Sequence, residues 1–193
     1  MKLSCLRPFA ALLLTLGLAA CGGKATYDVS GTITGLNNNG LVLTNNGDTV
    51  TPGAGATNFT FAKRIDYGTS YDITVTQNPA HMSCGVSGGT GTAGHYVSIQ
   101  ALVTCSQNVY TLGGSISGLT ADGLALINGN TRTTVTKDAT TFVMDGSVAD
   151  GATYGISVFT QPTGLKCVVQ PGTGTGTMGG ANVTTVQIAC NPG

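Results

Sequence analysis

Apolar and polar residues alternate with a period of two over many short stretches of this chain. In the first half the alternation covers residues 29–33, 41–43, 59–61, 71–75 and 97–99. Such alternation is typical of β-strands that bury one face and expose the other. Groups of Asn and Gly separate the stretches, at 37–40 and again at 45–48. These residue types favour tight turns, so the pattern predicts short strands joined by hairpins.

The pattern occurs twice, at an offset of 83 residues. Residues 27–36 read YDVSGTITGL, and residues 110–119 read YTLGGSISGL. The same offset pairs Cys84 with Cys167, and near the end an offset of 85 pairs Cys105 with Cys190. Solenoid repeats are shorter, at about 20–50 residues. The sequence therefore predicts two tandem domains, repeat 1 at 27–106 and repeat 2 at 110–191, joined by a link of about four residues centred on Gln107 and Asn108.

The composition supports an all-β chain. Only 8% of the residues are charged, every acidic residue is Asp, and 30 residues are Gly. Long amphipathic helices need Glu, Lys and similar residues on their wet faces, so a helical fold is excluded. A net charge of zero lacks the basic footprint of a nucleic-acid-binding protein. With 41% hydrophobic residues, each repeat can bury a core, and six or seven strands per repeat predict a small β-sandwich.

The order of strands within each repeat resembles a known kind of domain. A G-x-I strand, a G-L-x-L strand, a strand with Phe and a G-x-x-Y-x-I-x-V strand follow one another. This order resembles the Ig-like or prealbumin-like modules of bacterial surface proteins. The resemblance implies tandem Greek-key β-sandwiches, and its motifs are structural and carry no activity.

The first 20 residues form a targeting segment. Lys2 and Arg7 precede an apolar stretch at 9–20, which is too short to cross a bilayer as a helix of about 20 residues. It has the size of a signal-peptide core. The stretch ends in Leu-Ala-Ala-Cys at 18–21, which resembles the lipobox of bacterial lipoproteins. The alternative is an ordinary secretory signal that happens to end near a cysteine.

The lipobox resemblance implies that residues 1–20 are removed, that Cys21 carries lipid and that residues 21–26 form a lipidated tether. Gly22, where many Gram-negative lipoproteins retained in the inner membrane have Asp, favours the outer membrane. Cleavage leaves six basic residues against eight Asp, so we expect lipid rather than charge to hold the chain on the membrane. From Cys21 to Tyr27 the tether spans at most about 20 Å. The expected location is the bacterial cell envelope.

Four cysteines remain after Cys5 and Cys21 are set aside. In an exported protein they are expected to form disulfides, and four cysteines allow three pairings. The repeat selects Cys84–Cys105 and Cys167–Cys190. A metal site is the alternative, but there is no C-x-x-C motif, and spacings of 21 and 23 lack the close pairs of zinc sites.

No motif predicts catalytic, cofactor-binding or metal-binding residues, and no cofactor is expected. Residues 89–94 and 174–179 match G-x-G-x-x-G, but a dinucleotide site needs a following helix. We interpret both segments as flexible hairpin loops. His81 and His95 are the only histidines, and their counterparts in repeat 2 are glycines. Both are expected in exposed loops.

The sequence thus indicates a lipid-anchored structural or interaction protein of the cell envelope, without catalytic activity. Its expected partners are the membrane, through the lipid, and an envelope protein or glycan. The alternative function is binding of a glycan or small ligand through loops of repeat 1. In those loops His81, Met82 and His95 differ most from their counterparts. An enzyme ranks third.

Overall fold

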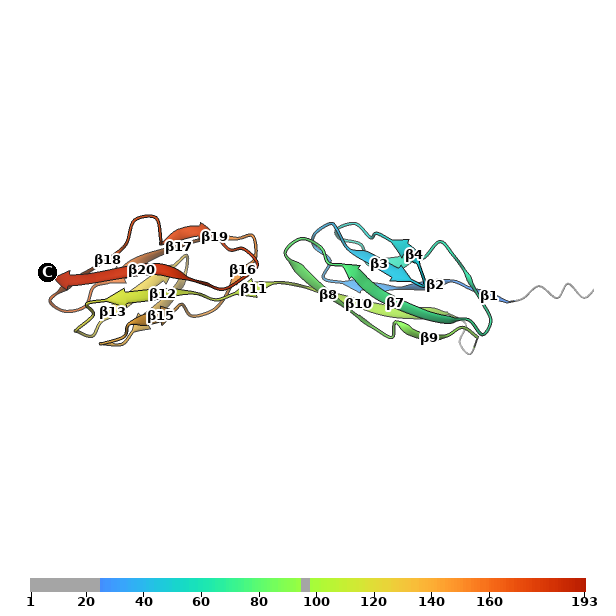
Figure 1. Cartoon of the computed structure of the whole chain (residues 1–193), viewed down its shortest axis with the longest axis horizontal. Coiled ribbons are helices and arrows are strands. Elements are labelled where there is room, and N and C mark those ends of the chain that lie inside the picture. Colours follow the sequence, from blue (N-terminus) through green and yellow to red (C-terminus); the bar gives the residue numbers. More distant parts are fainter. Residues whose placement is uncertain (1–24, 95–97) are drawn as a thin grey trace, which may run out of the picture.

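The computed structural model describes residues 25–94 and 98–193. Every regular element in this part of the chain is a β-strand, which confirms the prediction of an all-β fold. Figure 1 shows two β-bodies in line, one per repeat, with the chain passing once between them. The predicted targeting segment and Cys21 lie outside the described residues.

Repeat 1 consists of two four-stranded sheets and a small two-stranded one. Its strands are β1 (Thr26–Tyr27), β2 (Val29–Thr34), β3 (Val42–Asn45), β4 (Asp48–Val50), β5 (Asn58–Thr60), β6 (Ile65–Asp66), β7 (Ser70–Gln77), β8 (Met82–Ser87), β9 (Thr90–Thr92) and β10 (Ile99–Gln107). One sheet has the order β5-β2-β10-β8, and the other has the order β4-β3-β7-β9. Strand β1 pairs with β6 at one end. Within the first sheet β2 and β10 run parallel, whereas the remaining neighbours are antiparallel.

Repeat 2 has the same arrangement. Its strands are β11 (Val109–Tyr110), β12 (Leu112–Ser117), β13 (Leu124–Asn128), β14 (Thr131–Val135), β15 (Thr141–Val143), β16 (Val148–Ala149), β17 (Thr153–Thr160), β18 (Leu165–Val169), β19 (Thr175–Thr177) and β20 (Val183–Pro192). The sheet orders are β15-β12-β20-β18 and β14-β13-β17-β19. The repeated sequence therefore encodes one repeated topology.

Each repeat packs its own core between its two sheets. Leu41, Leu43 and Val103 are fully buried in repeat 1, and Leu124 and Leu126 are fully buried in repeat 2. No buried residue is shared between the two clusters. The inward positions are those that the alternation of period two selects, as in β10, where every second residue from Ile99 to Cys105 is buried. The β-sandwich class predicted from the pattern is confirmed.

The glycine of the G-x-I strand is required by close packing of neighbouring strands. A Cβ atom on Gly31 would collide with the carbonyl oxygen of Ala101 on β10 and with the ring of Phe59. In repeat 2 a Cβ atom on Gly114 would collide with the backbone of Val186. In each repeat, the parallel strand pair at the centre of the disulfide-linked sheet approaches closely only because this residue has no side chain.

The two G-x-G-x-x-G segments are not simple loops. Each contains a short strand, β9 or β19, that leaves the disulfide-linked sheet and pairs with β7 or β17 in the opposite sheet. The middle glycine lies against a tyrosine, Gly91 on Tyr71 and Gly176 on Tyr154, with no room for a Cβ atom. The interpretation of these segments as loops was wrong for residues 90–92 and 175–177, which pair as strands.

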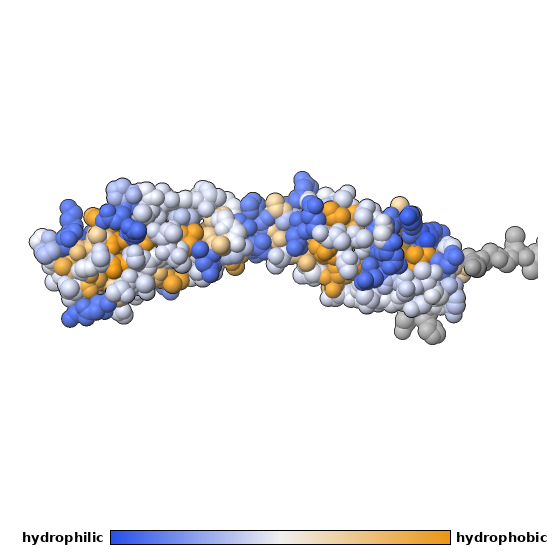
Figure 2. Space-filling model, in the orientation of Figure 1, coloured by the Kyte–Doolittle hydropathy of each residue, from blue (hydrophilic) through white to orange (hydrophobic). Residues whose placement is uncertain are grey.

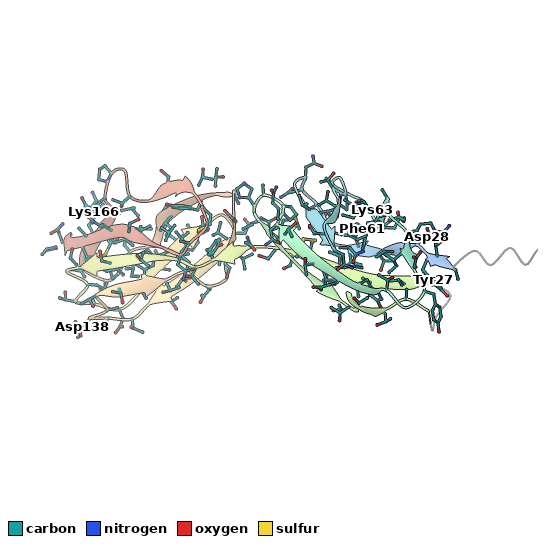
Figure 3. The ribbon with its side chains drawn as sticks, turned by 45° about the vertical axis from the view of Figure 1, so that its right-hand side comes forward. Tyr27, Asp28, Phe61, Lys63, Asp138 and Lys166 are labelled. Carbon is teal, nitrogen blue, oxygen red and sulfur yellow. A yellow bond between two sulfur atoms is a disulfide. The ribbon has the colours of Figure 1, made fainter. Side chains whose placement is uncertain are left out.

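The link between the repeats is shorter than expected. Strand β10 ends at Gln107 and β11 begins at Val109, so Asn108 alone lies between the two repeats outside any strand. Figure 3 shows Tyr27 and Asp28 at one end of the molecule and Asp138 and Lys166 toward the other. The repeats are therefore arranged end to end.

Candidate functional site

The contact between the repeats, here called the joint, consists of hydrogen bonds and one ion pair between polar groups of both repeats. Its backbone is built around Asn108. The amide of Asn108 donates to the carbonyl of His81 in repeat 1 at 2.9 Å. The amide of Asp150 in repeat 2 donates to the carbonyl of Asn108, also at 2.9 Å. The linker residue is thus bonded to both repeats.

Side chains add a second layer of contacts at the joint. The imidazole Nδ1 of His81 lies 3.1 Å from Oδ1 of Asp150. The carboxylate of Asp150 is nearly buried, with 9% of its side chain exposed, and its Oδ1 also accepts from the amide of Gly180 at 3.2 Å. The Gln107 side chain donates to the carbonyl of Asp150 at 2.9 Å. Rotation of one repeat against the other would break several of these hydrogen bonds together.

Local backbone conformation places His81 in the joint. His81 follows β7 in a turn and has a positive φ of 63°, which is uncommon for a residue other than Gly. Gly151 faces it, and a Cβ atom there would lie 3.2 Å from the imidazole. Gly151 thereby leaves room for the ring. Figure 2 shows hydrophilic residues gathered at the narrow waist between the two bodies.

The equivalent positions at the two outer ends lack this pair. The counterpart of His81 at the far end of repeat 2 is Gly164, and the counterpart of Asp150 at the outer end of repeat 1 is Tyr67. The side chain of Tyr67 is solvent-exposed. The backbone bond does recur, since the amide of Gly193 donates to the carbonyl of Gly164 at 3.1 Å. The repeated scaffold supplies the backbone bonds, and His81 and Asp150 are specific to the joint.

Of the three loop residues singled out in repeat 1, the structure describes His81 and Met82. Half of the His81 side chain is exposed, but its ring nitrogen faces Asp150. Met82 is 2% exposed and belongs to the core of repeat 1, so its expected place in a ligand-binding loop was wrong. His95 lies outside the described residues. Reading β8 from Met82 onward with a period of two would have shown that Met82 points inward.

The cysteines form two bridges between neighbouring strands. Cys84 on β8 is joined to Cys105 on β10, and Cys167 on β18 is joined to Cys190 on β20. These are the pairings that the repeat predicts. The Gln161 side chain also accepts from the amide of Cys167 at 2.7 Å and donates to its carbonyl at 2.9 Å. It thus occupies backbone groups that an edge strand would otherwise expose, a role that the sequence did not reveal.

Across 25–94 and 98–193, no group of three or more His, Cys, Asp or Glu residues could hold a metal ion. The same residues contain no helix that is long and apolar enough to cross a membrane. A shallow groove of about 430 Å³ runs between β7 and β8, and Asp72, Thr74 and Gly85 are among the residues that line it. It contains one carboxylate and no histidine.

Comparisons with known proteins add one structural likeness. No family model matches the chain, and no curated protein matches it. Among solved structures, the chain is similar to the major pilin protein (T3.2) from Streptococcus pyogenes serotype GAS13637, with 13% sequence identity and a TM-score of 0.31. The match covers 88% of this chain and 97% of that chain. A TM-score this low does not define a common fold or function.

Proposed function

We propose that the protein is a lipid-anchored, non-catalytic component of the bacterial cell envelope that acts as a short, stiff spacer presenting an interaction surface. The joint is the observation that carries the spacer part of this proposal. A chain that only tethered two independent domains would need no His81–Asp150 contact and no side chain of Gln107 bonded across the link. These contacts favour a fixed relation between the repeats.

Two further features agree with an exported protein. Disulfides persist outside the reducing cytoplasm, and this chain has one in each repeat. The Leu-Ala-Ala-Cys sequence at 18–21 supplies the proposed anchor. Two or more acyl chains on Cys21 give stable membrane binding, at about 0.8 kcal/mol per buried methylene. The short tether then keeps repeat 1 close to the membrane.

Substitution of the lipobox cysteine tests the anchor. The full chain is expressed in a Gram-negative host as wild type, as Cys21→Ser and as Cys5→Ser, and membrane and soluble fractions are compared. Cys5→Ser is the matched control, since it removes a cysteine from the same leader outside the lipobox. We expect Cys21→Ser alone to leave the membrane fraction and to lose the mass of the lipid. Membrane retention of Cys21→Ser equal to that of Cys5→Ser would exclude the lipoprotein assignment.

Gly22 gives a second test of the proposed location. If Asp at this position retains lipoproteins in the inner membrane, Gly22→Asp should move the protein from outer-membrane to inner-membrane fractions on a density gradient. Cys21 would still be lipidated, so total membrane binding should not change. An unchanged distribution would contradict sorting by this residue.

A further inference from the structure

One face of repeat 2 carries an exposed aromatic ring covered by a cation. The guanidinium carbon of Arg132 lies 3.7 Å from the ring centroid of Phe159. Phe159 is 47% exposed, although large apolar side chains are usually buried. Both residues occupy outward positions of the sheet β14-β13-β17-β19. Contact between the cation and the π-face holds the long arginine side chain in one place.

The strand register explains how the two side chains meet. Arg132 on β14 stands opposite Ile127 on the central strand β13. Phe159 lies on β17, on the other side of β13, at a register shift where Ala125 pairs with Thr160 and Leu126 pairs with Val158. Phe159 is thus the extra residue of a β-bulge, a feature that re-aims a side chain. The arginine side chain crosses β13 to reach it.

Repeat 1 has the same bulge but a different surface. The counterparts of Arg132 and Phe159 are Thr49 and Thr76. The Thr76 hydroxyl lies 3.0 Å from that of Thr44 and 3.3 Å from the carbonyl of Val42, so it is used within its own sheet. The same face of repeat 1 also carries the exposed Asp72, where repeat 2 has Gly155. The scaffold therefore does not require Arg132 or Phe159, and the charge of this face changes from negative to positive.

The guanidinium group has unused hydrogen-bonding capacity. Within the described residues, Arg132 has no ion-pair partner and donates no hydrogen bond to a protein group. A guanidinium presents five donors in a fork that fits a carboxylate or a phosphate with two bonds. The hydroxyls of Thr134 and Ser157 occupy exposed outward positions on the flanking strands and can donate as well. An anion placed beside Arg132 would meet several donors.

We propose that this face, defined by Arg132, Phe159, Ile127, Thr134 and Ser157, binds an acidic sugar unit of an envelope polysaccharide. The anionic group is held by Arg132, and the sugar ring packs on Ile127 and the exposed edge of Phe159. A patch with one aromatic, one aliphatic and one cationic side chain has the size to contact one or two sugar rings. The site lies on the sheet of repeat 2 and not on the loops of repeat 1, and it goes beyond the proposed spacer role.

Binding by the full chain in a neutral detergent tests the site. The probes are an oligomer of galacturonic acid, which supplies carboxylates, glucose 6-phosphate, which supplies a phosphate, and a neutral glucose oligomer, each titrated by calorimetry at low salt. We expect an acidic probe to bind and the neutral one not to bind. Which acidic probe binds more tightly distinguishes the two anions.

The variants take their residues from repeat 1, so the scaffold is known to accept them. Arg132→Thr should weaken binding at least about tenfold, since a charge-assisted bidentate contact is lost, and Phe159→Thr should weaken it several-fold. Arg64→Thr is the matched control, because it removes an exposed arginine that pairs with Asp28 at 3.0 Å; its binding should stay within about twofold of wild type.

Several results would overturn the proposal. These are binding of neither acidic probe, unchanged binding by Arg132→Thr, or an equal loss in Arg64→Thr, which would indicate a general charge effect. A dimer that depends on Arg132 in sedimentation would assign the face to a second copy of the chain instead. The titration does not depend on the anchor at Cys21, so failure here and failure of the fractionation test are separate outcomes.

Discussion

The imidazole of His81 and the carboxylate of Asp150 meet at 3.1 Å across the boundary between two otherwise separate cores. Asp150 is held by its own repeat through the amide of Gly180, and the backbone of His81 is held through Asn108. Neither side chain has an equivalent at the outer ends of the molecule. The contact therefore distinguishes the joint from the repeated scaffold. We expect this contact to limit the motion of one repeat relative to the other.

Removing the carboxylate should loosen the joint without unfolding either repeat. In Asp150→Ala the imidazole of His81 and the amide of Gly180 both lose a partner, which costs about 1 kcal/mol for each hydrogen bond. We expect small-angle X-ray scattering to show a broader distribution of interatomic distances, because bent arrangements of the two repeats become populated. Asp145→Ala, which removes an exposed carboxylate from the same repeat, is the control. Equal scattering curves for the two variants would show that the pair does not restrain the joint.

Because β2 and β10 approach closely, we expect a single methyl group added at Gly31 to lower the free energy of unfolding substantially. In Gly31→Ala the new Cβ meets the backbone of Ala101, which cannot move without shifting a central strand. Overpacking of this kind costs about 1–3 kcal/mol, measured as the free energy of unfolding in urea. Gly85→Ala is the control, because a Cβ there meets no atom within 4 Å. A loss of stability in Gly85→Ala as large as that in Gly31→Ala would contradict this explanation.

Each disulfide should stabilise only its own repeat. In the chain-entropy model a closed loop of this length contributes about 3 kcal/mol. The double substitution Cys167→Ser and Cys190→Ser should lower the denaturation midpoint of repeat 2 and leave that of repeat 1 unchanged. Hydrogen exchange of the amides in the two cores measures the two midpoints separately. Non-reducing peptide mapping of the wild type provides the direct check. A peptide that links Cys84 or Cys105 to Cys167 or Cys190 would refute the pairing within repeats.

The side chain of Gln161 protects the edge strand β18 from pairing with another chain. Its side chain bonds both backbone groups of Cys167, so Gln161→Leu leaves a donor and an acceptor of β18 without partners. Exposed edges of this kind promote pairing between chains. We expect faster aggregation on mild heating and about 1–2 kcal/mol lower stability. Gln187→Leu, an exposed glutamine on β20, serves as control, and similar aggregation of both variants would argue against edge protection.

The alternation of period two was enough to predict the β-sandwich class and most inward positions. Val29, Ile33 and Ile73 fall where the alternation puts them. It failed at Gly91 and Gly176, because a glycine-rich segment gives no periodic signal. Each of these glycines instead pairs across the sheet with a tyrosine of the neighbouring strand and packs on its ring. Local sequence carries little information about such contacts.

The joint and the face around Arg132 could not be predicted for a related reason. His81 and Asp150 lie in different repeats, and no spacing rule links them. The contact of Arg132 with Phe159 depends on a β-bulge that shifts the register by one residue. In an alignment of the two repeats, His81, Asp150, Arg132 and Phe159 all differ from their counterparts. Such departures mark positions that differ between the repeats, and the three-dimensional arrangement determines which of these residues meet.

The central claim is that the two repeats form one stiff unit, and residual dipolar couplings of backbone amides test it most directly. Couplings are measured for the wild-type chain in a weakly aligning medium, and an alignment tensor is fitted to each repeat separately. We predict tensors of equal magnitude and of one common orientation in the frame of the structure, because Asn108, Gln107, His81 and Asp150 bond the repeats together. Tensors of clearly different magnitude or orientation would show that the repeats move independently, and the spacer account would be wrong.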